Sequence, residues 1–394
     1  MTDSPGQIRH VAWREIFPWL ILLRTFRIAI SPLLLALATL AVLLNPIGWS
    51  LSSRIFLTQA QRVAQPATSQ LAAALPPAIQ AWLPADASNA LLGAYFQLAE
   101  PLARLYRLEF TLSEAAYYVF GFIWTMAIWS LPGGVITRRA VVQLATDEPL
   151  GIRPAVTYAA SKYLWYLLTP LYPLLGILAL AAPIAILGWI VWLLPGLGAL
   201  LAGIAWLGVA VAGVAAMWLI GGLIFGWPLM WPTISAERDG DPFEAFSRSY
   251  AYVYGKPLHY FFYVLVAAFF GTLCYAVVVG AATIVQEFGF WALSWGSGGP
   301  NAAELRADAL DVYLGNAHPS DRGTFWNAGA TLVGLVIGLI DSTVTAFRFS
   351  YFFCTTSAIY LLLRHDVDEK EMDEVHVETV PTSVPPPTHP VAEG

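Results

Sequence analysis

The sequence has few charged residues, which make up 12% of its 394 positions. Soluble domains carry about 25% charged residues, so this chain has too little polar surface to cover a globule of its size in water. Hydrophobic residues make up 58% of the total. We therefore predict that lipid is the solvent for much of the chain.

Cysteine is also scarce, and the two that occur, Cys274 and Cys354, both lie in apolar runs. Neither lies in a loop, so the sequence predicts no disulfide framework. No Asn-x-Ser or Asn-x-Thr sequon is present. The lack of a glycosylation site is compatible with a bacterial origin.

Several functional signatures are missing. The sequence has no basic cluster, so we expect no nucleic-acid partner. It also has no HExxH, Walker A, GxGxxG or CxxC pattern. We therefore expect no catalytic residues, no bound cofactor and no metal site, and we predict that the protein is not an enzyme.

Long apolar runs are what the chain has in abundance. Each is long enough to cross a membrane as a helix. The sequence therefore predicts an all-α polytopic membrane protein with about six transmembrane helices, placed at about 28–44, 115–136, 163–187, 197–225, 258–285 and 325–363.

The rest of the chain divides around these spans. We expect residues 1–27 to form an interfacial N-terminal segment, 28–363 a six-span membrane domain, and 364–394 a disordered, acidic, Pro-rich tail. Two long segments, 51–110 and 286–325, connect spans on the extracytoplasmic side. Apolar residues recur at helical spacing in the first of these, which predicts short amphipathic helices lying on the bilayer surface.

The distribution of Lys and Arg predicts the orientation. Thirteen lie in the N-terminal segment, the tail and the two loops on their side, whereas the longer segments on the other side hold six. Because cytoplasmic loops carry the excess of positive charge, we expect both termini to be cytoplasmic. The predicted location is a bacterial cytoplasmic (inner) membrane.

A pattern recurs along the cytoplasmic side, and we interpret residues 137–170 as its organising copy. A basic residue precedes a span that opens with aromatics or Pro at Arg24, Lys162 and Lys256. Cytoplasmic amphipathic helices are expected before the later spans, and they act as sliding elements or as simple anchors. We read a threefold repeat of helix pairs here, the alternative being chance similarity among Leu-rich segments.

Two short motifs carry a resemblance. An amphipathic segment after an acidic turn, Ala245-Phe-Ser-Arg-Ser249, resembles one in the membrane domain of certain glycerophosphodiester phosphodiesterases. The ending Ile359-Tyr-Leu-Leu-Leu-Arg364, with the acids after it, is similar to that of an uncharacterised family of bacterial six-helix membrane proteins. The resemblance implies a six-span fold and brings no catalytic residues.

The most specific candidate site is a polar face in the last apolar run. Asp341 and Arg348 are seven residues apart, with Thr345 between them, so the three share one face of a helix. Charges inside a span usually face the protein interior, which would suit an ion path or a polar substrate. The alternative, which we favour, is that the pair lies at the membrane interface, because the run exceeds the roughly 20 residues needed to span.

Two other sets of residues are weaker candidates for a functional site. Glu304, Asp308 and Asp311 lie on one helical face and could hold a divalent cation, but such a row is more often a solvated face. Ser297 lies in a Gly-rich setting like that of intramembrane serine proteases. The nearest His to a span, His259, is expected at the opposite end of its helix, so we reject that comparison.

The function most consistent with these features is a non-enzymatic membrane scaffold or accessory protein. Its predicted partners are the lipid bilayer and a protein that binds the acidic tail. The alternative is a transporter or channel for a small or lipid-like substrate that uses the Asp341–Arg348 face. The oligomeric state stays open.

Overall fold

The computed structural model describes residues 16–63, 89–105, 111–237, 240–316 and 320–375. The described part contains helices and no strand. Its elements in chain order are the 3-10 helix η1 (Pro18–Leu20) and the α-helices α2 (Ile21–Ala29), α3 (Pro32–Phe56), α4 (Gln59–Val63), α7 (Ala90–Leu105), α8 (Leu112–Thr146), α9 (Ile152–Ser161), α10 (Tyr163–Leu168), α11 (Leu171–Leu193), α12 (Pro195–Ala236), α13 (Pro242–Gly255), α14 (Pro257–Ser297), α15 (Gly299–Leu314) and α16 (Thr324–Asp368).

Six helical segments are long and apolar enough to cross a membrane, which confirms the prediction of an all-α polytopic membrane protein. They are Pro32–Phe56, Leu112–Thr146, Tyr163–Leu193, Gly196–Ala236, Pro257–Ser297 and Thr324–Asp368. The last apolar run is one continuous helix of 45 residues. At about 1.5 Å per residue it is about 67 Å long, roughly twice the thickness of the hydrocarbon core.

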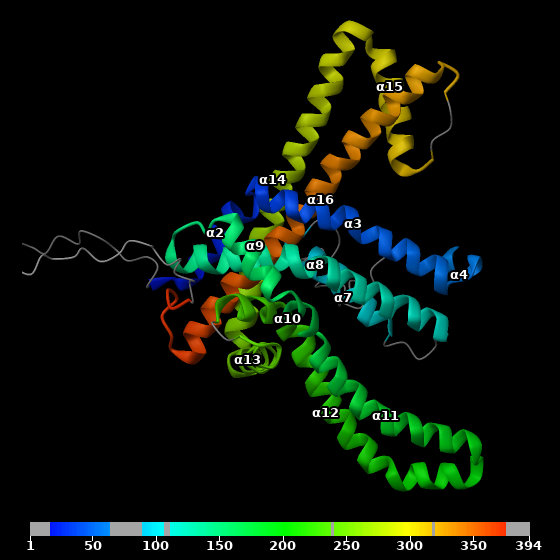
Figure 1. The fold of residues 1–394 in the computed structure, drawn as a ribbon, viewed down its shortest axis with the longest axis vertical. Coiled ribbons are helices and arrows are strands. Elements are labelled where there is room, and N and C mark those ends of the chain that lie inside the picture. The colour runs from blue at the N-terminus through cyan, green and yellow to red at the C-terminus, as the bar shows by residue number, and fades with distance from the viewer. Residues whose placement is uncertain (1–15, 64–88, 106–110, 238–239, 317–319, 376–394) are drawn as a thin grey trace, which may run out of the picture.

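These helices form three antiparallel pairs, α3 with α8, α11 with α12, and α14 with α16. A shorter helix precedes each pair: α2, the α9–α10 segment, and α13. The three hairpins meet in one region and leave it in different directions (Figure 1). We call this region the junction, and we define it by residues 133–146 of α8, 226–236 of α12 with Glu237 directly after them, and 346–364 of α16.

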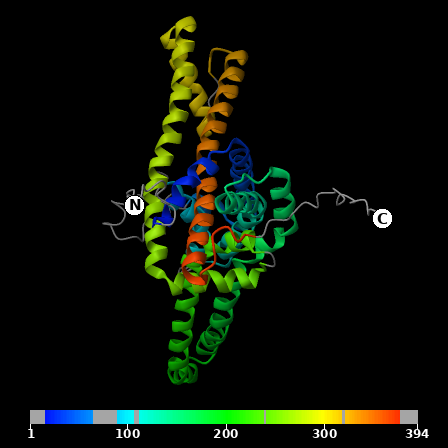
Figure 2. The same cartoon turned by 90° about the vertical axis from the view of Figure 1, so that its left-hand side faces the viewer.

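Helix α16 is the axis of the junction. Every side chain from Phe349 to Arg364 is buried, and the neighbouring helices pack tryptophans onto its aromatic rings. Trp129 of α8 stacks on Phe349 with ring centres 4.2 Å apart, and Trp231 of α12 stacks on Phe353 at 5.2 Å. The molecule is therefore organised around α16, which runs through its middle (Figure 2). Of residues 137–170, the end of α8 belongs to the helix that packs on α16, and α9 and α10 pack on α8.

Local sequence explains where two of these helices begin. At the start of α8, the amide of Glu114 donates to the Thr111 hydroxyl and the amide of Thr111 donates to the Glu114 carboxylate, which is a complete capping box. At the start of α13, the amide of Glu244 donates to the carboxylate of Asp241 at 2.6 Å. Both caps satisfy amides that a helix start leaves without partners.

One part of the prediction for the connection at 51–110 is wrong: protein, and not the bilayer surface alone, covers the apolar face of α7. Within α7 the exposed side chain is Gln97, and the others are buried or half-buried. The helix packs on α8, α14 and α16. An amphipathic pattern identifies an apolar face but does not say whether lipid or protein covers it, which explains the error. Residues 64–88 and 106–110 lie outside the described residues.

Candidate functional site

The structure places Asp341 of the predicted polar face against α15. Asp341 is exposed and accepts a hydrogen bond of 2.5 Å from the hydroxyl of Tyr313. This bond, together with partial burial, raises the pKa of Tyr313 to about 12. The Asp341 carboxylate thus holds the end of α15 against α16.

Arg348 faces a different neighbour. Its guanidinium lies 5.8 Å from the centre of the Tyr275 ring of α14. The Nε atom of Arg348 is buried and has no hydrogen-bond partner in the described part of the chain. No ion pair joins Asp341 to Arg348 among the described residues. The predicted face therefore exists, with Thr345 half-buried between the two charges, but α15 and α14 divide it.

Two of the three carboxylates of α15 contact residues at or just before the start of α16. Glu304 pairs with Arg322, and Asp308 accepts a hydrogen bond of 2.7 Å from the indole of Trp326. In the part of the chain that the structure describes, no group of three His, Cys, Asp or Glu side chains is arranged to hold a metal ion. Ser297 donates to the carbonyl of Leu293, at the end of α14 opposite His259.

A polar cluster that the sequence analysis did not identify lies in the junction, at the end of α12. One carboxylate oxygen of Glu237 accepts a hydrogen bond of 2.9 Å from the Tyr360 hydroxyl. The same oxygen lies 3.2 Å from Arg248 of α13 and 3.3 Å from Arg364 of α16. The side chains of Glu237 and Arg364 are 14% and 4% exposed, so this ion network is largely shielded from solvent.

A second buried arginine closes the same end of α12. Arg138 of α8 donates a hydrogen bond of 2.6 Å to the carbonyl of Ser235, and its guanidinium lies 4.0 Å from the centre of the Tyr158 ring. The Tyr158 hydroxyl donates to the carbonyl of Ile234 at 2.7 Å. The last carbonyls of a helix lack partners within it and carry partial negative charge. Arg138 and Tyr158 supply the missing donors.

Residues just beyond the predicted last span dock on this cluster. Tyr252 of α13 donates to Asp368 at 2.6 Å, and Tyr263 of α14 donates to Asp366 at 2.8 Å. Arg364 donates to the carbonyl of Glu374 at 2.6 Å. Burial, together with the bond to Asp368, raises the pKa of Tyr252. The predicted start of a disordered tail at residue 364 is therefore too early, and residues 376–394 lie outside the described residues.

The sequence held a partial signal for this cluster. Acidic residues follow each span that ends at the junction, including Glu237 in the run Ile234-Ser-Ala-Glu237. The pattern locates a carboxylate at a helix end. It does not indicate that Arg248 and Arg364, from helices far apart in sequence, converge on that carboxylate.

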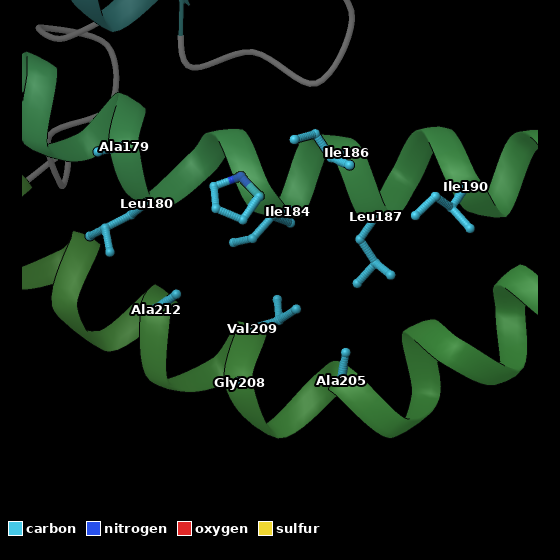
Figure 3. Close-up of a pocket in the computed structure, with 11 residues that line it drawn as sticks. Ala179, Leu180, Ile184, Ile186, Leu187, Ile190, Ala205, Gly208, Val209 and Ala212 are labelled. Carbon is cyan, nitrogen blue, oxygen red and sulfur yellow. The ribbon is translucent and has the colours of Figure 1, made fainter.

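An apolar cavity of about 470 Å³ lies between α11 and α12 (Figure 3). Leu187 of α11 and Val209 of α12 each point toward the opposite helix. No residue from 163 to 236 carries a charge. The lining is aliphatic throughout: Ala179, Leu180, Pro183, Ile184, Ile186, Leu187, Ile190, Ala205, Gly208, Val209 and Ala212.

Comparison with known proteins gives no relative. No protein-family model matches the chain. No curated protein and no solved structure matches it either.

Proposed function

We propose that the protein is a membrane scaffold or accessory protein, whose junction fixes three hairpins and whose α11–α12 hairpin offers apolar faces to lipid and to a membrane helix of a partner. The observation that carries this proposal is the isolation of that hairpin. It projects away from the junction (Figure 1). Within the most apolar window of its first span, no residue is buried.

The exposed faces of α12 are large and apolar. Trp206, Leu207 and Met217 are 65%, 78% and 67% exposed. An apolar face is at home in lipid, and the small residues among these side chains allow a neighbouring helix to approach closely. Gly203 and Gly213 have open space where a side chain would begin. In the junction, in contrast, Glu237 is engaged with Arg248, Tyr360 and Arg364.

Photo-crosslinking in the native membrane tests this function. A benzophenone amino acid replaces Trp206, which is exposed, or Trp227, which is 8% exposed and serves as the control. We expect the probe at position 206 to give a discrete protein adduct in addition to lipid adducts, and the probe at 227 to give intramolecular links. The proposal would be contradicted if the probe gave only lipid adducts at position 206 and also at positions Leu207 and Met217.

The orientation is part of the proposal. The excess of Lys and Arg on the junction side supports a cytoplasmic junction in a bacterial inner membrane. The test uses single cysteines in a background lacking Cys274 and Cys354. We expect an impermeant maleimide to label Arg153→Cys, an exposed site beside the junction, from the cytoplasm only. Gln59→Cys, at the far end of the first hairpin, should be labelled only from the other side.

One observation favours the second candidate, transport along the Asp341–Arg348 face: Arg348 has a buried Nε atom without a hydrogen-bond partner among the described residues. A cysteine scan of residues 338–352 with an impermeant thiol reagent separates the two functions. Labelling every three to four residues, centred on that face, supports a water-lined path. Protection throughout supports the scaffold.

A further inference from the structure

We infer that α7 is a re-entrant helix, which enters the membrane from the face opposite the junction, ends near mid-depth and locks the three hairpins to one another. Its length is the first reason. It has 16 residues and is therefore about 24 Å long, which is short of the roughly 20 residues that a spanning helix needs. A helix of this length can enter a membrane but cannot cross it.

The start of α7 lies roughly 17–18 Å from the junction ends of α14 and α12, about half the thickness of the hydrocarbon core. The side-chain amide of Asn89 donates to the carbonyl of Ala268 at 3.1 Å and to the hydroxyl of Thr272 at 3.0 Å. Ala268 is about 17 Å along α14 from its start at Pro257,. One turn into α7, the Tyr95 hydroxyl donates to the carbonyl of Ile224 at 2.9 Å. Ile224 is about 18 Å from the junction end of α12,.

The other end of α7 lies toward the opposite face. Arg104 in its last turn pairs with Glu100 at 2.8 Å, and a guanidinium nitrogen of Arg104 lies 3.4 Å from the Tyr118 hydroxyl. Tyr118 is six residues, or about 9 Å, from the start of α8 at Leu112,. The opposite end of α8 contributes Arg138 to the junction. The axis of α7 therefore runs from near mid-depth in the membrane toward the face opposite the junction.

The polar groups at the inner end of α7 have hydrogen-bond partners within the protein, as hydrocarbon surroundings require. Backbone groups without partners are costly in hydrocarbon, so irregular backbone at that depth must be covered by protein. Asn89 is fully buried. Its side-chain oxygen accepts from the amides of Leu91 and Leu92 at 3.0 and 2.9 Å, while its amide group ties the cap to α14. One side chain thus caps α7 and anchors it.

Through these contacts α7 touches all three hairpins: α8 of the first, α12 of the second through Tyr95, and α14 and α16 of the third. It occupies the space where they diverge. Withdrawal of α7 would require Asn89 to lose its partners on α14, so the side chain acts as a latch.

Thiol chemistry on the full-length protein in a bilayer tests the inference, in a background lacking Cys274 and Cys354. Ala94→Cys lies on the fully buried face of α7, and Gln59→Cys is an exposed control on α4. We expect a water-soluble maleimide to label Ala94→Cys at least roughly tenfold more slowly than Gln59→Cys, since labelling must await local opening. Equal rates would overturn the inference.

A cross-link tests where α7 ends along α14. On prolonged reaction with a short membrane-permeant bismaleimide, which allows for the slow opening of this buried site, cysteines at Asn89 and Thr272 should be joined. Cysteines at Asn89 and Val285, about 20 Å further along α14, should not. Failure of the first pair, or equal yield from both, would overturn the inference.

In the latch test, Asn89→Leu should raise the labelling rate of Ala94→Cys roughly tenfold, and Gln97→Leu should leave it unchanged. Should Asn89→Leu fail to fold, Tyr95→Phe gives the same test in milder form. No increase in either variant excludes the latch.

Discussion

At the scale of single residues, the junction is held by charges placed at a helix end. Glu237 follows the last residue of α12 and is approached by Arg248 and Arg364. A buried ion pair is weak evidence for net stability, because both charges had to leave water. Removal of one partner is costly, however, because the other charge remains buried and unpaired.

Substitution of Glu237 tests this asymmetry. Glu237→Gln leaves the 4%-exposed Arg364 without its carboxylate, and we expect the free energy of unfolding to fall by roughly 3 kcal/mol. The matched control is Glu244→Gln. Glu244 also pairs with Arg248, at 2.7 Å, but both side chains are about one-third exposed, so we expect a loss below about 1 kcal/mol. Denaturant unfolding in detergent measures both, and equal losses would contradict the assignment.

The sequence could locate polar residues but not their partners. Asp341 and Arg348 belong to one helix, α16, and their spacing alone puts them on one face of it. Their neighbours, Tyr313 and Tyr275, come from other helices, and no local pattern encodes such a contact. Glu237 was missed for the same reason.

At the scale of elements, helices approach closely where glycine faces tryptophan. In the α3–α8 pair the arrangement is reciprocal: Trp124 of α8 covers Gly48, and Trp49 of α3 covers Gly121. A methyl group at either glycine would overlap the indole ring. The Trp49 indole also donates to Thr125 at 3.1 Å, which fixes the ring in place and leaves it little room to move.

A methyl group at this contact should therefore separate the helices. We expect Gly121→Ala to lower the free energy of unfolding by about 1–3 kcal/mol through overpacking. Gly208→Ala on α12 is the control, because a side chain there meets open space. In that variant the higher helix propensity of alanine should be neutral or stabilising by up to about 1 kcal/mol. Thermal unfolding measures the stability of both variants. A loss of stability in both would contradict this explanation of the Gly–Trp contact.

Helix α15 gives a second test at this scale. Tyr313→Phe and Asp341→Asn each weaken the bond between α15 and α16. Because both partners are exposed, we expect a loss of about 1 kcal/mol, confined to α15 and seen as faster amide exchange there. Asp311→Asn, at an exposed site on the same helix, should leave exchange unchanged. Uniform acceleration across the protein would argue against a local role.

Element type was predictable where the signal is length and hydropathy. Five of the six predicted spans fall within the observed long helices, and the first, 28–44, begins four residues before the helix Pro32–Phe56. An apolar run of this length has few other stable conformations in lipid. The role of each helix was not predictable. Apart from the row of Asp341, Thr345 and Arg348, helix α16 is apolar on every side, so its apolar pattern does not indicate which helices pack against it. Its central position follows from shape matching with α8, α12 and α14. Helix α7 illustrates the same point for an amphipathic segment, because its sequence pattern does not show which neighbours cover its apolar face.

At the scale of the whole molecule, three hairpins share one packed junction and separate beyond it (Figure 1). Residues 226–236 of α12 are almost all buried, whereas residues 197–217 of the same helix are exposed or half-buried, apart from Gly198. One helix thus belongs to two environments. The inner part stabilises the fold, and the outer part is free for lipid or for a partner.

Nitroxide accessibility along α12 tests this division most directly. Single spin labels are placed through 197–217 and 226–236 in purified protein, reconstituted alone at high lipid excess. The account predicts high collision rates with oxygen at the outer positions that face away from α11, and low rates at all inner positions. A periodic stripe of low accessibility at those outward-facing positions would mean that another part of the protein covers the hairpin. That result would contradict the central claim that the α11–α12 hairpin stands free.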